Sequence, residues 1–318
     1  MKSSLRFACL LLSLAFASAA CAAGAAPAKK KVLFFTKSAG FEHSVIKRIA
    51  GNPSFAMQVL VELGAKNNLE FTESKDGSLF STEYLAQFDA IVFYTSGVLT
   101  QAKNNEKLGD GQPPMTEAGK AAFLKAIADG KGFVAIHAAS DSFHSPGNVD
   151  HGPARNQADG PNTTDYVKML GAEFIKHDAQ QPAHQIVVDA KFPGMGAVPA
   201  NFGPHEEWYS LKNFAPDLHV LLVQDTKGMT GPSYARPNYP ATWARAHGKG
   251  RVFYTSMGHR EDVWLNPVFQ SVLLGGLNWT LRRADAEVTP NLATAAPQAN
   301  VLPVYVAPPP PAPKKAKQ

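Results

Sequence analysis

Cysteine is almost absent from this sequence. Only Cys9 and Cys21 occur in 318 residues, and both lie within the first 22 residues. A chain processed after Cys21 retains no thiol, so it has no disulfide, no thiolate nucleophile and no cysteine-ligated metal. Any metal in the mature chain must therefore be held by histidine, carboxylate or tyrosine side chains.

The N-terminus lacks an apolar run long enough to cross a bilayer. Phe7 to Phe16 is apolar but too short to span, Lys2 and Arg6 precede it, and the small residues ASAACAAG follow it. This order is typical of a secretory signal peptide, so we expect residues 1–22 to be removed and the mature protein to be periplasmic or extracellular, without a transmembrane segment. Lipid attachment at Cys21 stays an alternative, although Ser18 stands where a large apolar residue is usual.

Several functional motifs are also missing. The Gly-x-Gly-x-x-Gly and Walker patterns do not follow the predicted strands, so we expect no nucleotide cofactor. The Gly-x-Ser-x-Gly elbow and His-Glu-x-x-His are absent. A clustered basic face is not expected either: eight of the 31 basic residues lie in the two ends, whereas all 26 acidic residues lie within 32–287, which therefore carries a net charge of −3. This balance argues against a nucleic-acid partner.

The remaining sequence alternates between short apolar runs and helical patterns. Strands are predicted at 32–36, 69–74, 90–95 and 132–137, with helices at 44–63 (broken near Pro53), 116–129, 166–170 and 266–281. This order predicts βαβ units and a mostly parallel sheet with helices on both faces. Denser strands at 185–189, 220–224, 241–245 and 251–256 predict an added antiparallel section. We assign residues 23–30 to a linker, 31–283 to the domain, and 284–318 to a Pro/Ala-rich disordered tail.

Polar, titratable residues recur directly after the apolar runs. They include His43, Ser96, His137, Asp141 and His259. Ligands in open α/β sheets bind beyond the carboxyl ends of the strands, where these segments would converge. A single histidine is more often a structural residue than a ligand, but the group of His43, His137 and His259 predicts a functional site.

Two other segments contribute candidates. Glu206 and Glu207 are paired carboxylates that could lie at the wall of the pocket. The aromatic residues Trp208 and Tyr209, directly after them, offer faces for sugar rings. The Gly-, Pro- and Asn-rich segment 145–165 is expected to form a mobile loop over the pocket. Solvated turns for the carboxylates and core packing for the aromatic residues remain alternatives.

Seven ordered blocks between Lys31 and Leu281 resemble the ThuA-like (trehalose utilisation) family. Among them are KVLFFTKSAGFEHSVI, GKGFVAIHAASDSFH, HEEWYSLKNFAPDLHVLL and YPATWARAHGKGRVFYTSMGH. The resemblance implies a flavodoxin-like, class I glutamine amidotransferase-like fold. It places the family's recurring polar positions at His43, His137, Asp141, Glu207, Tyr209 and His259. The amidotransferase cysteine would fall at the turn around His137, and its absence excludes thiolate-dependent glutamine hydrolysis. Gly258-His259-Arg260 departs from the Gly-His-Glu that relatives often carry, the acid being displaced to Glu261.

The resemblance also implies a role in the use of trehalose-like disaccharides or keto-sugars. One hypothesis is an enzyme, a hydrolase, lyase or isomerase, with His43, His137, Glu207 and His259 as catalytic residues and Asp141, Tyr209, Ser96 and Trp208 as ligand contacts. In it, a divalent metal on His43, His137 and His259 could polarise a carbonyl. A periplasmic saccharide-binding module and a scaffold acting through the Pro-rich tail are the alternatives.

Overall fold

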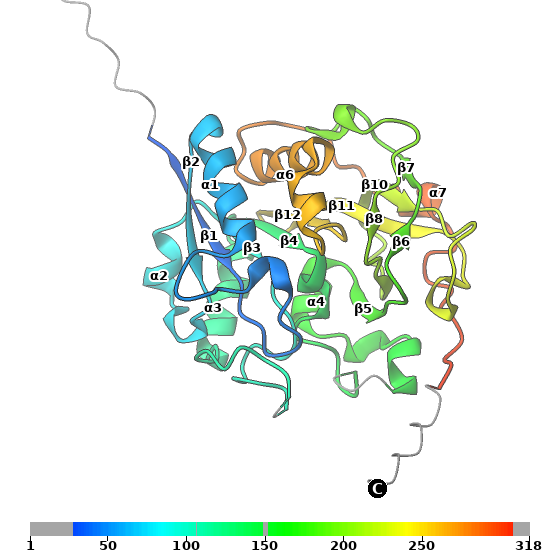
Figure 1. Ribbon diagram of the computed structural model, residues 1–318, viewed down its shortest axis with the longest axis horizontal. Helices are drawn as coiled ribbons and strands as arrows, with labels where there is room; N and C mark the ends of the chain where they lie inside the picture. The colour runs from blue at the N-terminus through cyan, green and yellow to red at the C-terminus, as the bar shows by residue number, and fades with distance from the viewer. Residues whose placement is uncertain (1–27, 106, 149–151, 308–318) are drawn as a thin grey trace, which may run out of the picture.

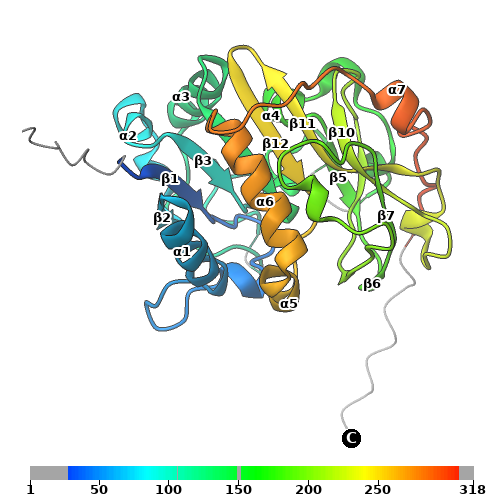
Figure 2. The ribbon, with the colours of Figure 1, turned by 90° about the horizontal axis from the view of Figure 1, so that it is seen from above.

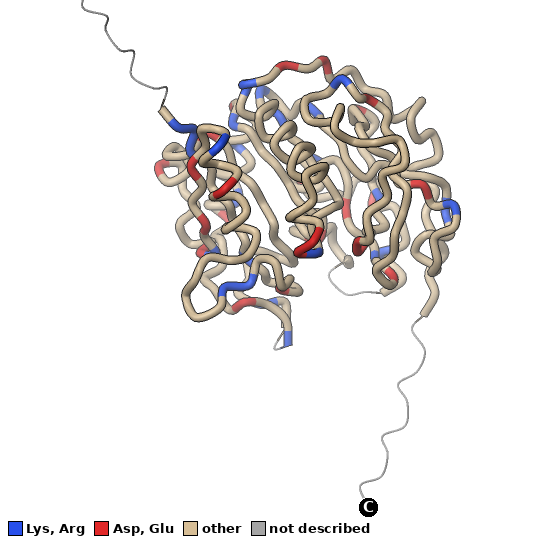
Figure 3. Tube along the Cα trace, turned by 45° about the horizontal axis from the view of Figure 1, so that its top comes forward, with Lys and Arg blue, Asp and Glu red and all other residues tan. Residues whose placement is uncertain are grey.

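The computed structural model describes residues 28–105, 107–148 and 152–307. The predicted signal peptide, with Cys9 and Cys21, lies outside these ranges. Within them, no helix combines the length and apolarity needed to cross a membrane. Basic and acidic residues are interspersed along the described parts of the chain (Figure 3).

A mixed eight-stranded sheet forms the centre of the domain (Figure 1). Its spatial order is β2 (Leu69–Ser74), β1 (Lys30–Phe35), β3 (Ala90–Phe93), β4 (Gly132–Ile136), β12 (Gly250–Thr255), β11 (Tyr239–His247), β10 (His219–Gln224) and β7 (Gln185–Val187). The first five strands are mutually parallel, and the pairs from β12 to β7 are antiparallel. The predicted flavodoxin-like sheet with an added antiparallel section is thus confirmed.

Helices cover both faces of this sheet (Figure 2). One face carries α1 (Phe55–Asn67), α5 (Glu261–Leu265) and α6 (Pro267–Thr280), and the other carries α2 (Thr82–Ala86), α3 (Glu117–Ala128) and α4 (Asp165–Leu170). The side chains of Ser54 and Thr116 accept the backbone N–H three residues on, which fixes the starts of α1 and α3. Upstream of α1, the predicted helix from residue 44 is only the 3-10 turn η1 (Ser44–Ile46), because Pro53 interrupts the pattern.

The inner parallel strands β1, β3 and β4 are buried on both faces over most of their length, as their continuous apolar runs predict, whereas the edge strand β2 alternates buried and exposed residues. Val32 through Phe35 on β1 and Phe133 through Ile136 on β4 are fully buried. Side chains of this part of the sheet therefore serve the core, and polar chemistry is confined to the loops at the strand ends.

Two small antiparallel sheets were not predicted. They pair β5 (Glu173–Lys176) with β9 (Ser210–Lys212) and β6 (Gln181–Pro182) with β8 (His205–Glu206). These strands are two to four residues long, too short for a periodic pattern to reveal them. They matter because the segment joining β8 to β9 carries Glu207.

Much of the C-terminal segment packs on the domain, which corrects the expectation of a disordered tail for residues 284–307. Helix α7 (Leu292–Ala295) lies against β10, and Leu292, Ala296 and Ala299 are buried. The side-chain amide of Asn291 bonds both backbone groups of Val220, and that of Asn300 bonds both backbone groups of Phe214. These amides supply the partners that a neighbouring strand would otherwise give.

Candidate functional site

Three histidines from distant parts of the chain meet beyond the carboxyl ends of the central strands. His137 directly follows β4, His259 follows β12 after the Gly258 turn, and His43 ends the loop after β1 and begins η1. The imidazole rings lie face to edge, with centroids 5.0 to 5.3 Å apart. Because β1, β4 and β12 run parallel, their ends share one edge of the sheet, and this brings the rings together.

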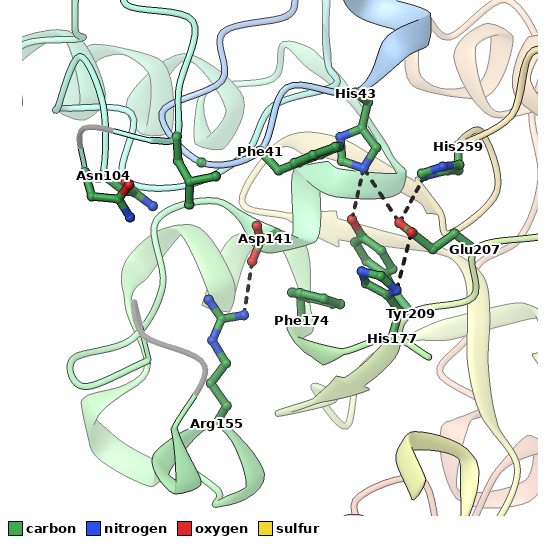
Figure 4. Close-up of a pocket in the computed structure, with 13 residues that line it drawn as sticks. Phe41, His43, Asn104, Asp141, Arg155, Phe174, His177, Glu207, Tyr209 and His259 are labelled. Atoms are coloured by element: carbon green, nitrogen blue, oxygen red, sulfur yellow. Dashed lines mark hydrogen bonds and ion pairs between the residues drawn. The ribbon is translucent and has the colours of Figure 1, made fainter. Parts of the chain in front are cut away.

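A single carboxylate, Glu207, joins these histidines (Figure 4). Its Oε2 lies 3.0 Å from Nδ1 of His259, 3.4 Å from Nε2 of His137 and 3.8 Å from Nε2 of His43. Four donor atoms, one from each residue, all lie within 4.8 Å of one another. The resulting His43–His137–Glu207–His259 group is called the histidine–glutamate cluster below.

The backbone of His137 is held in an unusual conformation. Its φ of 45° lies in the left-handed region, which costs energy for a side-chain-bearing residue and is frequent at functional sites. Its Nδ1 lies 2.8 Å from the carbonyl oxygen of Ser256, which can only accept, so Nδ1 carries the hydrogen. Nε2 therefore presents a lone pair to the cluster, the arrangement found in metal-ligating histidines.

Burial and mutual contact set the charges in the cluster. Burial lowers the pKa of His137 to about 3 and also lowers the pKa of His43, despite the nearby Glu207. Burial opposes ionisation of Glu207, but contacts with His137, His259 and His43 outweigh it and hold the pKa of this carboxyl far below its ordinary value. For His259 the contact with Glu207 outweighs burial, so its pKa is raised. The cluster thus offers an ionised carboxylate and two neutral imidazoles at neutral pH.

The cluster lies at one end of a cavity of about 600 Å³. Phe41, Leu108, Phe174 and Tyr209 supply apolar wall, and the polar lining includes Asn104, Asn105, Asp141, Arg155 and His177. Such a mixture of aromatic surface and few polar groups is usual for small-molecule sites. The volume suits a ligand of the size of one or two sugar rings.

Asp141 and Arg155 lie on another side of this cavity, away from Glu207 (Figure 4). The Nη1 of Arg155 is 3.2 Å from Oδ1 of Asp141, and Nε2 of His144 is 2.6 Å from the same oxygen. Nδ1 of His144 lies 2.9 Å from Glu173, a buried carboxylate that also accepts from Ser145. This charged network fixes both Asp141 and the loop that carries Arg155.

A family model described as ThuA, trehalose utilisation, matches residues 31–280. The chain belongs to the ThuA family. A ThuA-like protein from Bacteroides uniformis is 22% identical with a TM-score of 0.58, over 85% of this chain and 98% of that one. A second, from Parabacteroides merdae, is 15% identical with a TM-score of 0.52, over 87% of this chain and 98% of that one. At these identities the likeness to the solved structures shows the fold alone, and no match to a curated protein was found.

Six of the predicted site residues line the cavity or belong to the cluster of this ThuA domain. They are His43, His137, Asp141, Glu207, Tyr209 and His259. The hydroxyl of Tyr209 lies 3.4 Å from Nε2 of His43, and its ring packs on His137 with centroids 4.1 Å apart. Glu261, the displaced acid, instead accepts a hydrogen bond from Ser44 at 2.7 Å.

Two predicted ligand contacts do not reach the cavity, and the prediction is corrected for both. Trp208 is fully buried, and its indole N–H donates to the carbonyl of Gln181, so its faces serve core packing. Ser96 is buried as well, and its hydroxyl donates to the carbonyl of Phe41. Ser96 thus stabilises the loop between β1 and His43 through this hydrogen bond, without facing the cavity.

Arg155 and His177, near the site, were not identified from the sequence, and Glu206 was predicted only as one member of the Glu206–Glu207 carboxylate pair. Glu206 is fully buried, and its carboxylate accepts from the backbone N–H groups of Glu207, Gly258 and His259. Burial nevertheless raises the pKa of Glu206 to about 7. Arg155 comes from the predicted pocket loop, whose residues 149–151 lie outside the described ranges. His177, at the end of β5, faces Glu207; its place just after a strand was the signal that could have found it.

Proposed function

We propose that this ThuA-family protein is exported and acts on a sugar, a trehalose-like disaccharide or keto-sugar, with a divalent transition metal held by the histidine–glutamate cluster. The observation that carries the proposal is the convergence of three imidazoles on one carboxylate oxygen at the end of a sugar-sized cavity. The signal-peptide pattern of residues 1–22 supports export.

The chemistry of the cluster fits a metal ion. Nε2 of His137 and Nδ1 of His259 are buried and make no hydrogen bond in the described residues, although both lie within ion-pair distance of Glu207. Leaving such atoms unpaired costs free energy, which coordination would offset. Imidazole nitrogens with a carboxylate suit zinc and its neighbours in the first transition row. Small side-chain movements would bring the four donor atoms to the spacing of ligands about 2 Å from one ion.

The chain's own residues prepare this site for a sugar. A bound metal would supply Lewis acidity toward a carbonyl or hydroxyl oxygen of the ligand. The ionised Glu207 and the neutral His43 and His137 are in the states that coordination requires. Phe41, Phe174 and Tyr209 offer apolar surface for the C–H faces of a sugar ring, while Asn104 and Asp141 offer polar groups for its hydroxyls.

Metal content is the first test of the proposal. The mature protein, beginning at residue 23, is loaded with zinc, cobalt or manganese, desalted and analysed by mass spectrometry. We expect about one ion per chain in the wild type, loss in His137→Ala and His259→Ala, and retention in His184→Ala. His184 is a half-exposed histidine paired with Asp225 outside the cluster, which makes it a matched control. A metal-replete wild type that holds no ion would overturn the metal site.

Ligand identity is tested on the same preparations. We expect trehalose or a ketose such as D-fructose to raise the melting temperature of the wild type, with a smaller effect in the His137→Ala protein. Products detected by NMR on prolonged incubation would establish an enzyme. Binding without products would instead favour a saccharide-binding module, and no response to any sugar would contradict the proposed ligand class.

A further inference from the structure

The two oxygens of Glu207 face different groups. Oε2 faces the three histidines of the cluster, whereas Oε1 lies 3.3 Å from Nδ1 of His177. The His177 side chain is 41% exposed and lines the cavity, in contrast to 17% or less for the cluster histidines. His177 therefore stands between the cluster and the space that a ligand would fill.

The surroundings of His177 determine which of its nitrogens carries hydrogen. Nδ1 lies 3.0 Å from the carbonyl oxygen of Asp178 as well as near the Glu207 carboxylate, and both neighbours only accept hydrogen bonds. Nδ1 is therefore the protonated nitrogen, and Nε2 bears a lone pair. No group in the described ranges 28–105, 107–148 and 152–307 bonds that Nε2, and in Figure 4 it is the nitrogen without a contact to Glu207.

Ring packing holds this orientation. The His177 imidazole is stacked on Tyr209 at an interplanar angle of 15° with centroids 5.8 Å apart, and on Phe174 at 23° and 6.2 Å. A ring fixed by two parallel neighbours and by a hydrogen bond at Nδ1 loses little further freedom when it binds a ligand. Its acceptor is thus preorganised.

We propose that Nε2 of His177 accepts a hydrogen bond from a hydroxyl group of the ligand and so selects a neutral, hydroxyl-bearing sugar at this side of the cavity. This inference rests on the proposed function. The lone pair at Nε2 and the negative charge of Glu207 behind the ring both disfavour an anionic group here, so a sugar phosphate or sugar acid is rejected at this position. A ligand lacking the hydroxyl leaves Nε2 without a partner and binds more weakly.

His177→Phe separates this role from a purely structural one. The substitution keeps a ring that can stack on Tyr209 and Phe174 but removes the acceptor. If His177 contacts the ligand, the variant retains its metal and binds sugar about tenfold more weakly, the usual effect of one hydrogen bond. If His177 only orients Glu207, metal binding is weakened instead. His177→Gln, whose amide oxygen reaches to a similar place, should recover part of the affinity.

The measurement is isothermal titration of trehalose and of D-fructose into metal-loaded wild type, His177→Phe, His177→Gln and the control His184→Phe. Loss of affinity in His177→Phe alone, with metal content unchanged, supports the inference. Unchanged affinity in His177→Phe, or lost metal in that variant, overturns it.

If neither sugar binds the wild type, the proposed ligand class fails, and a second measurement decides the inference on its own. Long-range ¹H–¹⁵N NMR spectra of the metal-loaded protein report which nitrogen of His177 carries hydrogen. A bare Nε2 supports the acceptor role, and a protonated Nε2 with a bare Nδ1 overturns it.

Discussion

The buried carboxylate of Glu206 accepts a hydrogen bond from the backbone N–H of His259 at 3.1 Å. The same oxygen accepts from Gly258 at 2.8 Å, and the other oxygen accepts from Glu207 at 2.8 Å. One side chain thus ties together the two segments that carry Glu207 and His259. Glu206 thus fixes the backbone of the residues in the cluster, whereas Glu207 contacts the histidine side chains.

Glu206→Gln should therefore damage both stability and metal binding. The amide retains one acceptor oxygen and turns an N–H₂ group toward backbone donors, so at least one buried N–H loses its partner. We expect the free energy of unfolding to fall by about 1–3 kcal/mol and metal affinity to fall about 10- to 100-fold, as for other residues that orient ligands. Urea denaturation and competition with a chelating dye measure the two effects. Glu62→Gln, on the exposed face of α1, is the control and should change neither.

Of the two aromatic residues Phe41 and Trp208, we expect Phe41 to contribute to ligand binding and Trp208 to contribute to the stability of the fold. Phe41 is 57% exposed and lines the cavity, whereas Trp208 is fully buried. Phe41→Ala should weaken sugar binding with little change in stability. Trp208→Phe should lower the free energy of unfolding by about 1–3 kcal/mol, because the carbonyl of Gln181 loses its donor and a cavity opens. Calorimetric sugar titration and thermal denaturation of both variants test this, and a Trp208→Phe protein of normal stability but lost sugar affinity would contradict it.

Glu207 and Trp208 are neighbours in the sequence, but only Glu207 lines the cavity, and this difference was not predicted. In the extended segment from β8 to β9, successive side chains point to opposite sides. Glu207 and Tyr209 line the cavity, and Glu206 and Trp208 are buried away from it. The alternation was available from the sequence, but the segment is too short for its direction to be assigned without knowing which neighbour it packs on. The sequence pattern gave both carboxylates and both aromatic residues as candidates, and the resemblance to the ThuA family singled out Glu207 and Tyr209.

The histidines of the cluster were easier to predict than their surroundings. Apolar strands of four to six residues are readable as buried parallel strands, and the residues after them converge wherever the sheet is parallel. His177, Arg155 and Glu206 depend on strands of two to four residues and on a loop, whose positions are set by distant contacts. The packing of the C-terminal segment was not predicted for the same reason: it depends on distant contacts. The Pro/Ala-rich composition gives no sign that the side chains of Asn291 and Asn300 bind backbone groups of the domain.

The network around His144 predicts a pH-dependent stability. Burial and Arg155 lower the pKa of His144, but Asp141 and Glu173 outweigh them, so the pKa is raised above 6.5 in the folded protein. The stabilisation that protonated His144 provides is therefore fully present below about pH 6.5 and is lost as the pH rises through the folded-state pKa. His144→Gln removes it. Urea unfolding at several pH values should show the difference between wild type and variant shrinking toward alkaline pH, and a difference that grows with pH would refute this.

The C-terminal segment should be needed for stability. Leu292, Ala296 and Ala299 are buried, and the guanidinium of Arg236 donates to the carbonyl of Ala299 at 2.5 Å as well as to Ser210 and Leu211. A chain that stops after Glu287 exposes this apolar surface and leaves the buried Arg236 short of an acceptor, so we expect the free energy of unfolding to fall by several kcal/mol, on the order of 3. A chain that stops after Ala307 keeps all of these contacts and serves as the control. Thermal and urea denaturation of both truncated proteins measure the effect. Equal stability of the two truncated proteins would mean that the C-terminal segment adds nothing to the stability of the fold. A loss of stability confined to the shorter chain would show that residues 288–307 stabilise the domain. In this range Asn291 joins the segment to β10, and Asn300 joins it to Phe214.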